Sequence, residues 1–296
     1  MSALVRAFAK VPAPNRFINS GFLIDQRNSG AAQTITAGAA LAYTVDRWYA
    51  ACTGANVTGQ AVAGVNSQEM YRFTGAASVT GIQFGQRIET ASCADLAGQN
   101  AVLSVDLANS LLTTVTWTAY YANTADTFGT LASPTRTQIA TGTFTVNATT
   151  TRYVVPIAIP SAAKTGIEIV LSVGAQTSGT WTIGRAKLEA GLIATPWVTE
   201  SSGREMAQCQ RFYEVFTGST IQVGGYALAT NSLPYAFPFK VTKRAAPTIV
   251  NLGSQNAQNC TPSVAATIDA FLVTISVSST GAWIYSTPIG VFACEL

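Results

Sequence analysis

Ile183-Gly-Arg-Ala-Lys-Leu-Glu-Ala-Gly-Leu-Ile-Ala-Thr-Pro-Trp197 divides the chain in two. The stretch begins with the alternation of a β-strand, and Pro196 ends it because proline cannot donate a ladder hydrogen bond. Gly203-Arg-Glu-Met-Ala-Gln-Cys-Gln-Arg-Phe-Tyr213 then follows with the spacing of a short amphipathic helix. Together the two segments predict that one β-rich region closes here and that a second begins after the helix.

The region before this division alternates apolar and polar residues with the period of two that is typical of half-buried strands. Turns rich in Gly, Asn, Pro and Thr separate the segments, as in antiparallel sheets packed face to face. We therefore expect a jelly-roll β-sandwich over residues 34–200, with residues 87–97 as a turn of helix at one end. The alternating segments are 101–107, 115–121, 153–159, 167–173 and 181–183.

The helix after the division has a capping-box pair, Ser202 and Glu205, at its start. Its apolar face would pack on a domain or lie at an oligomer axis. We expect this linker helix over residues 201–216. The apolar residues that share its face are Met206, Cys209, Tyr213 and Phe216.

Short alternating segments after the helix predict a second, smaller β-sandwich domain over residues 217–296. At the other end, prolines and asparagines surround two short apolar runs, so residues 1–33 have the character of an N-terminal arm that docks on another surface. The expected fold class is all-β: an arm, a jelly roll, a linker helix and a second β-sandwich.

The composition excludes several classes of function. Of the 296 residues 48% are hydrophobic but only 10% are charged, against about 25% in an average domain. The net charge of +3 is spread along the chain, which argues against a nucleic-acid partner. No apolar run reaches about 18 residues, so we expect no membrane insertion, and no signal peptide is visible.

The chain has no histidine, which excludes Ser/His/Asp and Cys/His catalysis. The five cysteines are widely spaced, odd in number and form no CxxC pair, so we expect neither a zinc site nor a dense disulfide framework. We expect no cofactor. The cysteines would be free buried thiols, with a Cys52–Cys93 disulfide as the open alternative. Calcium needs oxygen ligands, but the closing strand, residues 183–188, is basic, so we also expect no metal.

Several segments resemble the tail fibre and receptor-binding proteins of tailed bacteriophages, and they occur in the order that this family shows. Two of them are Asn15-Arg-Phe-Ile-Asn-Ser-Gly-Phe-Leu-Ile-Asp-Gln-Arg27 and Trp181-Thr-Ile-Gly-Arg-Ala-Lys-Leu-Glu-Ala-Gly-Leu-Ile-Ala-Thr-Pro-Trp197. The others are residues 43–48, 86–89, 96–98, 209–213 and 243–248, so that the resemblance spans nearly the whole chain.

This resemblance implies a virion protein, made in the host cytoplasm, that attaches to other virion structural proteins through its N-terminal arm. It further implies a carbohydrate-binding-module-like jelly roll and a C-terminal β domain, assembled as a homotrimer. The implied ligand is a host surface polysaccharide, bound for host attachment.

A glycan site needs exposed aromatic rings, on which the C–H faces of sugars stack, beside amide or carboxylate groups. In the jelly roll the candidates are Tyr120, Asn123 and Asp126; in the C-terminal domain they are Tyr226, Asn231, Tyr235, Trp283 and Tyr285. Trp48 and Trp181 alternate with apolar residues, so we interpret them as core.

Three functions remain open at this stage. The leading hypothesis is a glycan-binding virion protein without enzymatic activity. The second is a structural adaptor or decoration protein that binds no receptor. The third is a polysaccharide depolymerase, but the 14 acidic residues show none of the paired motifs that glycoside hydrolysis requires.

Overall fold

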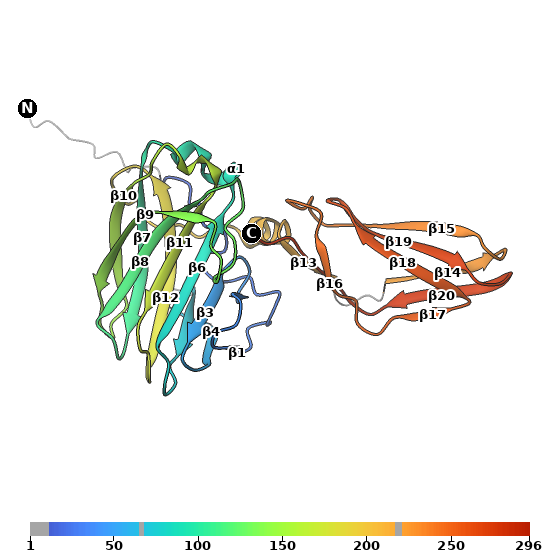
Figure 1. The fold of residues 1–296 in the computed structure, drawn as a ribbon, viewed down its shortest axis with the longest axis horizontal. Coiled ribbons are helices and arrows are strands. Elements are labelled where there is room, and N and C mark those ends of the chain that lie inside the picture. The colour runs from blue at the N-terminus through green and yellow to red at the C-terminus, as the bar shows by residue number, and fades with distance from the viewer. Residues whose placement is uncertain (1–11, 65–67, 217–220) are drawn as a thin grey trace, which may run out of the picture. The chain divides into compact units, whose positions relative to one another are not determined.

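The computed structural model describes residues 12–64, 68–216 and 221–296. The chain divides into two compact units, one built on residues 1–200 with Leu296 and the other on residues 201–295. All strand pairs in both units are antiparallel among the described residues. The predicted all-β class is confirmed, with a jelly-roll sandwich in the first unit (Figure 1).

Two six-stranded sheets form the first unit. In spatial order, the first sheet contains β1 (Gln33–Ile35), β4 (Val57–Ala63), β5 (Glu69–Thr74), β12 (Thr180–Ala190), β7 (Asn100–Asn109) and β10 (Thr151–Ala158). The second contains β2 (Ala42–Tyr43), β3 (Tyr49–Thr53), β6 (Gly81–Ile88), β11 (Ile167–Val173), β8 (Thr114–Ala122) and β9 (Arg136–Thr145). The five alternating segments of the sequence lie in β7, β8, β10, β11 and β12, as predicted.

The inner faces of both sheets supply the core of the first unit. Trp48 and Trp181 are buried, which confirms their interpretation as core residues. Phe84 stacks between Trp48 and Tyr71, with ring centroids 5.0 Å away on each side. Aromatic pairs at such distances add to the stability gained from burial alone.

The helical segments of the first unit are short: α1 (Thr90–Cys93), η2 (Ala94–Leu96) and η3 (Ala163–Thr165). The first two lie within residues 87–97, where the sequence predicts a turn of helix. The described part of the expected arm docks on its own chain, because Phe17 and Phe22 belong to the core of the sandwich. Residues 1–11 lie outside the described residues, so attachment through the arm stays a prediction.

The second unit begins with α2 (Ser202–Gln210) and contains three sheets of three strands. They are β13 (Tyr213–Phe216), β21 (Gly290–Ala293) and β16 (Thr248–Asn251); β14 (Ile221–Ala227), β20 (Gly281–Thr287) and β17 (Asn256–Gln258); and β15 (Ser232–Pro238), β19 (Ala270–Val277) and β18 (Cys260–Ala266). The core gathers around Phe271, Val273, Tyr285 and Phe292.

The predicted linker helix over 201–216 is too long. The helix ends at Gln210, and Tyr213–Phe216 instead form β13, paired with β21. The 3.6-residue spacing of Cys209, Tyr213 and Phe216 therefore does not mark one helical face. Pairing with a strand some eighty residues away overrides the local pattern, which the sequence window could not reveal.

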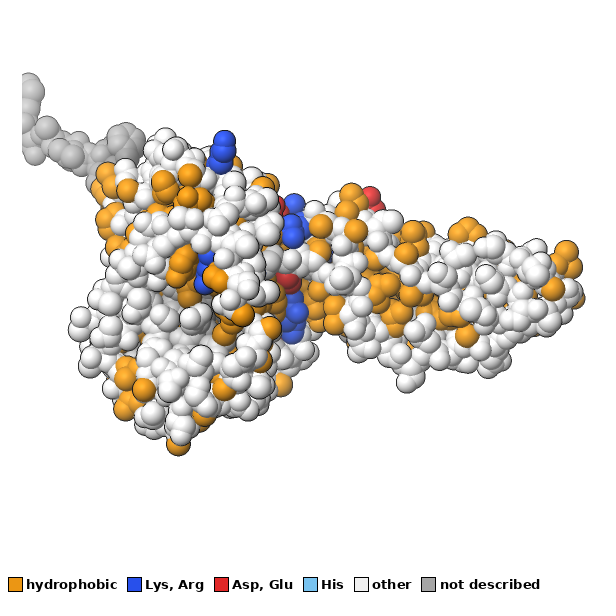
Figure 2. All heavy atoms as spheres, in the orientation of Figure 1, with side chains coloured by type: hydrophobic (Ala, Val, Ile, Leu, Met, Phe, Trp, Pro, Cys, Tyr) orange, Lys and Arg blue, Asp and Glu red, His pale blue; other side chains and the backbone are white. Residues whose placement is uncertain are grey.

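All five cysteines are free thiols, so the alternative of a Cys52–Cys93 disulfide is excluded in this structure. The surface seen in Figure 2 is largely uncharged, as the composition predicts. Among the described residues, no helix is both long enough and apolar enough to cross a membrane.

Candidate functional site

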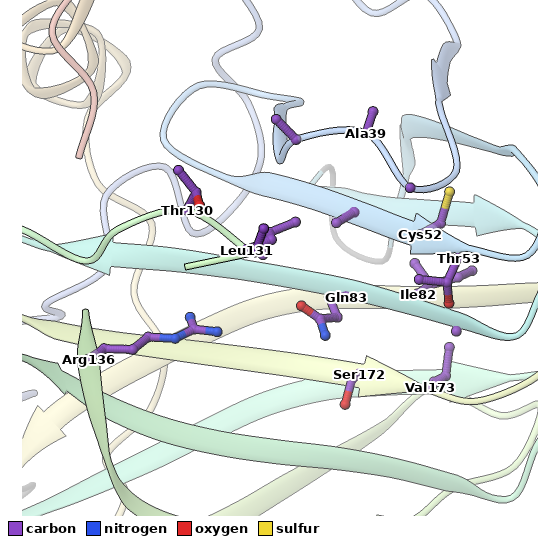
Figure 3. Close-up of a pocket in the computed structure, with 15 residues that line it drawn as sticks. Ala39, Cys52, Thr53, Ile82, Gln83, Thr130, Leu131, Arg136, Ser172 and Val173 are labelled. Carbon is purple, nitrogen blue, oxygen red and sulfur yellow. The ribbon is translucent and has the colours of Figure 1, made fainter. Parts of the chain in front are cut away.

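An open groove of about 730 Å³ crosses the outer face of the second sheet of the first unit (Figure 3). Strands β3, β6 and β11 form its floor, and the loops 38–40 and 130–132 contribute further lining. The residues that line it are Gly38, Ala39, Ala40, Ala51, Cys52, Thr53, Gly81, Ile82, Gln83, Thr130, Leu131, Ala132, Arg136, Ser172 and Val173.

The lining combines small apolar side chains with neutral polar groups. Gln83 is exposed on β6, and its side chain lines the groove. Thr53 accepts a hydrogen bond of 2.8 Å from the Thr80 hydroxyl. No aromatic ring is among the lining residues, so the groove offers hydrogen-bonding groups and methyl surfaces rather than a stacking platform.

Arg136 is the only charged residue among those that line the groove. It begins β9, and in Figure 3 its guanidinium extends along the floor toward the Gln83 amide. The guanidinium lies 4.1 Å from the centroid of the Tyr120 ring and pairs through Nη1 with Glu168. Burial is the largest single influence on the pKa of Arg136 and acts to lower it. The charge of Glu168, the hydrogen bond to Glu168 and the nearby Tyr49 and Tyr120 together outweigh burial, and the net shift is upward.

The register of the second sheet brings the partners of Glu168 together. Glu168 on β11 lies opposite Arg87 on β6 and opposite Tyr120 on β8, so the three side chains form a row across the outer face. Glu168 is fully buried, and its Oε1 accepts hydrogen bonds from Arg87 Nε at 2.9 Å and from the Tyr49 hydroxyl at 2.5 Å. Burial, followed by the charge of Glu168, raises the pKa of Tyr49 well above its ordinary value.

Gly85 explains why Tyr49 can reach Glu168. It pairs with Tyr49 across β3 and β6, and a Cβ atom there would lie 2.7 Å from both the Tyr49 hydroxyl oxygen and the Ile169 carbonyl oxygen. Only glycine leaves room for the ring to lie across β6 at this point. One glycine on β6 therefore permits a contact between β3 and β11.

The structure gives each jelly-roll residue predicted as a sugar site a partner within the chain, and sugar binding by these residues stays a prediction. Tyr120 is half-buried beneath the Arg136 guanidinium, so its ring face is already occupied by a cation–π contact. Asn123 is exposed and accepts a 2.7 Å hydrogen bond from the Thr137 hydroxyl. Asp126 accepts a 2.7 Å hydrogen bond from the Thr90 amide at the start of α1, which is a structural role.

Burial divides the five candidates of the second unit. Trp283 and Tyr285 are 4% and 0% exposed and belong to the core, so the prediction that they contact a ligand is corrected: a buried ring cannot stack on a sugar. Tyr235 is half-buried with its ring centroid 5.9 Å from that of Trp283. Tyr226, which is 74% exposed, and Asn231 remain on the surface, where binding by them stays a prediction.

Sequence reasoning missed the residues of the groove, above all Gln83, Ser172 and Arg136. One signal was available: Glu168 interrupts the apolar strand Ile167–Val173, and a carboxylate buried on a sheet face needs a cationic partner. The structure places Arg87 on β6 and Arg136 on β9, but nothing local in the sequence shows that both face the same carboxylate. The described residues contain no group of three or more acidic or cysteine side chains that could hold a metal ion.

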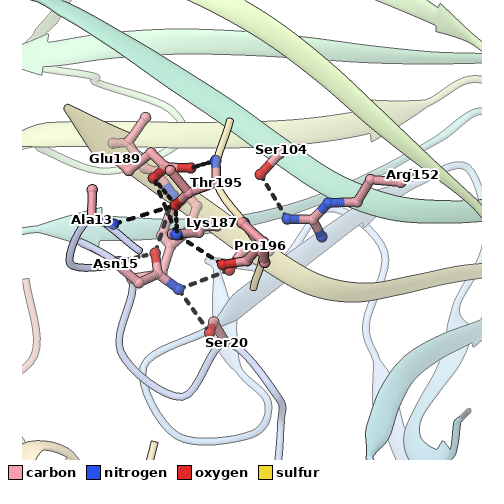
Figure 4. A network of polar contacts seen from close by, with 12 residues as sticks. Ala13, Asn15, Ser20, Ser104, Arg152, Lys187, Glu189, Thr195 and Pro196 are labelled. Carbon is pink, nitrogen blue, oxygen red and sulfur yellow. Dashed lines mark hydrogen bonds and ion pairs between the residues drawn. The ribbon is translucent and has the colours of Figure 1, made fainter. Parts of the chain in front are cut away.

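A second network holds the segment after β12 in place (Figure 4). Lys187 and Glu189 are both buried and form an ion pair of 3.1 Å. The Lys187 ammonium also donates to the Thr195 hydroxyl at 2.5 Å and to the Pro196 carbonyl at 3.1 Å. Because all these partners lie within ten residues, the network folds the chain back on β12.

The N-terminal segment joins the same network through Asn15. Its Oδ1 accepts a 3.1 Å hydrogen bond from the Leu188 amide, and its Nδ2 donates to the Ala186 carbonyl and the Ser20 hydroxyl at 2.9 Å each. The Trp197 indole donates to the same hydroxyl at 3.1 Å. The segments 15–27 and 181–197, which carry the family resemblance, are therefore bonded to each other, whereas none of the seven resembling segments contains a groove residue.

No family model matches the chain, and no curated protein matches it. Among solved structures, the enzymatically active domain of tailspike protein 4 from bacteriophage CBA120 has 16% identity and a TM-score of 0.35, over 49% of this chain and 19% of that one. A CBM4 structure has 15% identity and a TM-score of 0.38, over 58% and 98%. A putative sugar binding protein from Bacteroides thetaiotaomicron has 14% identity and a TM-score of 0.38, over 60% and 100%. Likenesses this distant assign no family.

Proposed function

We propose that this protein binds a glycan, without cleaving it, in the groove over β3, β6 and β11. The observation that carries the proposal is the chemistry of the groove: neutral hydrogen-bonding groups alternate with small apolar side chains along an open channel of about 730 Å³. Ligand sites commonly have such volumes and combine apolar walls with a few polar groups that fix the orientation of the ligand.

The lining suits a sugar chain in particular. Gln83 can donate and accept at once, and the hydroxyls of Thr53, Thr130 and Ser172 can each do the same. Sugar hydroxyls have the same dual character. The methyl groups of Ala39 and its neighbours would meet the apolar C–H surfaces between those hydroxyls.

The carboxylates support binding without hydrolysis. Glycoside hydrolysis uses two carboxyl groups on either side of the scissile bond. The lining of the groove includes no aspartate or glutamate. The buried carboxylates of Asp106, Glu168, Glu189 and Glu214 are all held in ion pairs with arginine or lysine, so none of them is placed to act on a sugar in the groove.

We extend the proposal to a tailed-phage virion, on the strength of the sequence resemblance alone. In this setting the protein attaches to other virion structural proteins through its N-terminal residues and contacts host surface polysaccharide with its first unit. We also propose that the protein assembles as a homotrimer through its second unit.

The test is binding of the full chain to an array of immobilised bacterial polysaccharides and oligosaccharides, followed by titration calorimetry with the glycans that are retained. We expect binding that periodate oxidation of the glycan abolishes. Gln83→Ala should weaken it about three- to tenfold, which is the usual value of a neutral hydrogen bond. Gln222→Ala, at an exposed position of β14, is the matched control and should leave binding unchanged.

Absence of binding to every glycan would overturn the proposal and favour the structural adaptor. Release of reducing ends from a bound polysaccharide would show hydrolysis and overturn the non-enzymatic part. Binding with equal losses in Gln83→Ala and Gln222→Ala would place the site outside the groove.

A further inference from the structure

One end of the groove lies beside a cluster of two arginines and one glutamate. Two guanidinium groups, those of Arg87 and Arg136, share the single carboxylate of Glu168. Both oxygens of that carboxylate are already used, since Oε1 accepts from Arg87 and Tyr49 and Oε2 accepts from Arg136. Glu168 therefore cannot compensate both cations.

The two arginines differ in how well the protein satisfies them. Arg87 donates through Nε to Glu168, through Nη2 to the Gly129 carbonyl at 3.0 Å and through Nη1 to a backbone oxygen of Leu296, the last residue of the described chain, at 2.7 Å. Arg136 donates only through Nη1, and its Nε is buried without a hydrogen-bond partner among the described residues. The unmet donor capacity therefore belongs to Arg136, which is the arginine that lines the groove.

The Arg136 side chain is also held in place by its neighbours. Its side chain is 11% exposed, Glu168 fixes one edge of the guanidinium, and the Tyr120 ring lies 4.1 Å beneath it. A cation that is fixed and partly removed from water attracts an anion more strongly than an arginine in solvent does. The Nη2 group is not used in the contact with Glu168 and can donate to an oxyanion.

We propose that the glycan bound in the groove carries an oxyanion, as a uronic acid or a sugar phosphate does, and that Arg136 binds this group. The inference rests on the proposed glycan binding. It adds the chemical class of the sugar and the direction in which the glycan lies along the groove. The anionic sugar lies at the Arg136 end, and the neutral sugars continue past Gln83 toward Thr53.

The experiment uses an array of matched glycans that differ only in charge: uronic acid polymers beside their carboxyl-reduced forms, and phosphorylated oligosaccharides beside their dephosphorylated forms. Wild-type protein should retain the charged member of one pair at least tenfold better than its neutral partner. Retention should fall as salt is raised, because the contact joins opposite charges. The pair that responds identifies the oxyanion as carboxylate or phosphate.

Three variants locate the effect. Arg136→Gln should weaken binding of the charged glycan by about 10- to 100-fold, the usual range for a charged hydrogen bond, and remove the preference for charge. Arg136→Lys keeps the charge beside Glu168 and should retain part of the preference, which guards against loss of folding as the explanation. Lys164→Gln removes an exposed positive charge in η3 and should change nothing.

The outcomes separate this inference from the proposed function. Equal binding of charged and neutral members, or a charge preference that survives Arg136→Gln, would overturn the role of Arg136 and leave glycan binding intact. Failure to bind any glycan in either form would overturn both.

Discussion

Cys93 shows how burial of one thiol makes stability depend on pH. The side chain is fully buried, with Sγ 3.3 Å from the Glu89 carbonyl, and burial raises the pKa of the thiol from 9.0 to about 12. The unfolded chain releases this proton above pH 9.0, whereas the folded chain keeps it. The stabilisation from this group is therefore fully present below pH 9.0 and is lost as the pH rises toward 12.

We predict that wild-type protein loses about 1–2 kcal/mol more unfolding free energy than Cys93→Ala between about pH 8 and pH 10.5. Urea denaturation in the presence of a reductant measures this difference. The comparison between the two proteins cancels the contributions of the other thiols and of the tyrosines. Parallel pH profiles for wild type and variant would contradict the assignment to Cys93.

At the scale of the element, the close passage of Tyr49 over β6 depends on Gly85. A methyl group at this position would meet the Tyr49 hydroxyl oxygen and the Ile169 carbonyl oxygen at 2.7 Å, which is closer than real Cβ contacts allow. We predict that Gly85→Ala lowers the unfolding free energy by about 1–3 kcal/mol, the usual cost of overpacking. Urea denaturation of the full chain measures it.

Gly174→Ala is the control for this prediction. Gly174 follows β11 in the same unit, and a Cβ atom there would meet nothing within 4 Å. The substitution should change the unfolding free energy by no more than about 0.5 kcal/mol. If both substitutions lowered the unfolding free energy equally, the effect of Gly85→Ala would not come from the packing of Tyr49 over β6.

The elements also show which features a sequence can predict. Period-two alternation placed five strands of the first unit correctly, because the apolar residues of their inner faces pack on one core, even though the outer faces of β7, β11 and β12 are also largely buried. The same reasoning failed at residues 213–216, where a spacing compatible with a helix belongs to a strand. Local spacing shows which positions are apolar, but pairing with a distant strand determines whether those residues form a helix or a strand.

At the scale of the whole molecule, the groove could not be predicted, because its lining comes from segments between residues 38 and 173 that no local pattern connects. The resemblance, by contrast, follows segments that bond to one another, such as Asn15 with Leu188 and the Gln86 amide with the Ile18 backbone. It therefore describes the scaffold of the chain. The groove residues lie outside the resembling segments. The candidates chosen from the sequence were selected for aromatic stacking and missed the groove, because its lining contains no aromatic ring.

The second unit leaves many strand edges open. Each of its three sheets has three strands, so two in every sheet, six of the nine, have an unpaired edge among the described residues. Several apolar side chains of this unit are also exposed, among them Tyr226 at 74% and Val250 at 58%, and hydrophobic side chains gather on the face seen in Figure 2. Open edges and exposed apolar groups together favour association with further copies.

We predict that the full chain sediments as a homotrimer of three times 30.9 kDa, about 93 kDa. Tyr226→Lys places a charge on the edge strand β14 and should shift the population toward the monomer, since charged edges resist pairing. Leu192→Lys makes the same change at a residue of the first unit that is 63% exposed, and it should leave the trimer intact. Sedimentation equilibrium over a range of concentrations distinguishes the two. A wild-type mass near 31 kDa at every concentration would refute the trimer, and a trimer unaffected by Tyr226→Lys would exclude this edge as its contact.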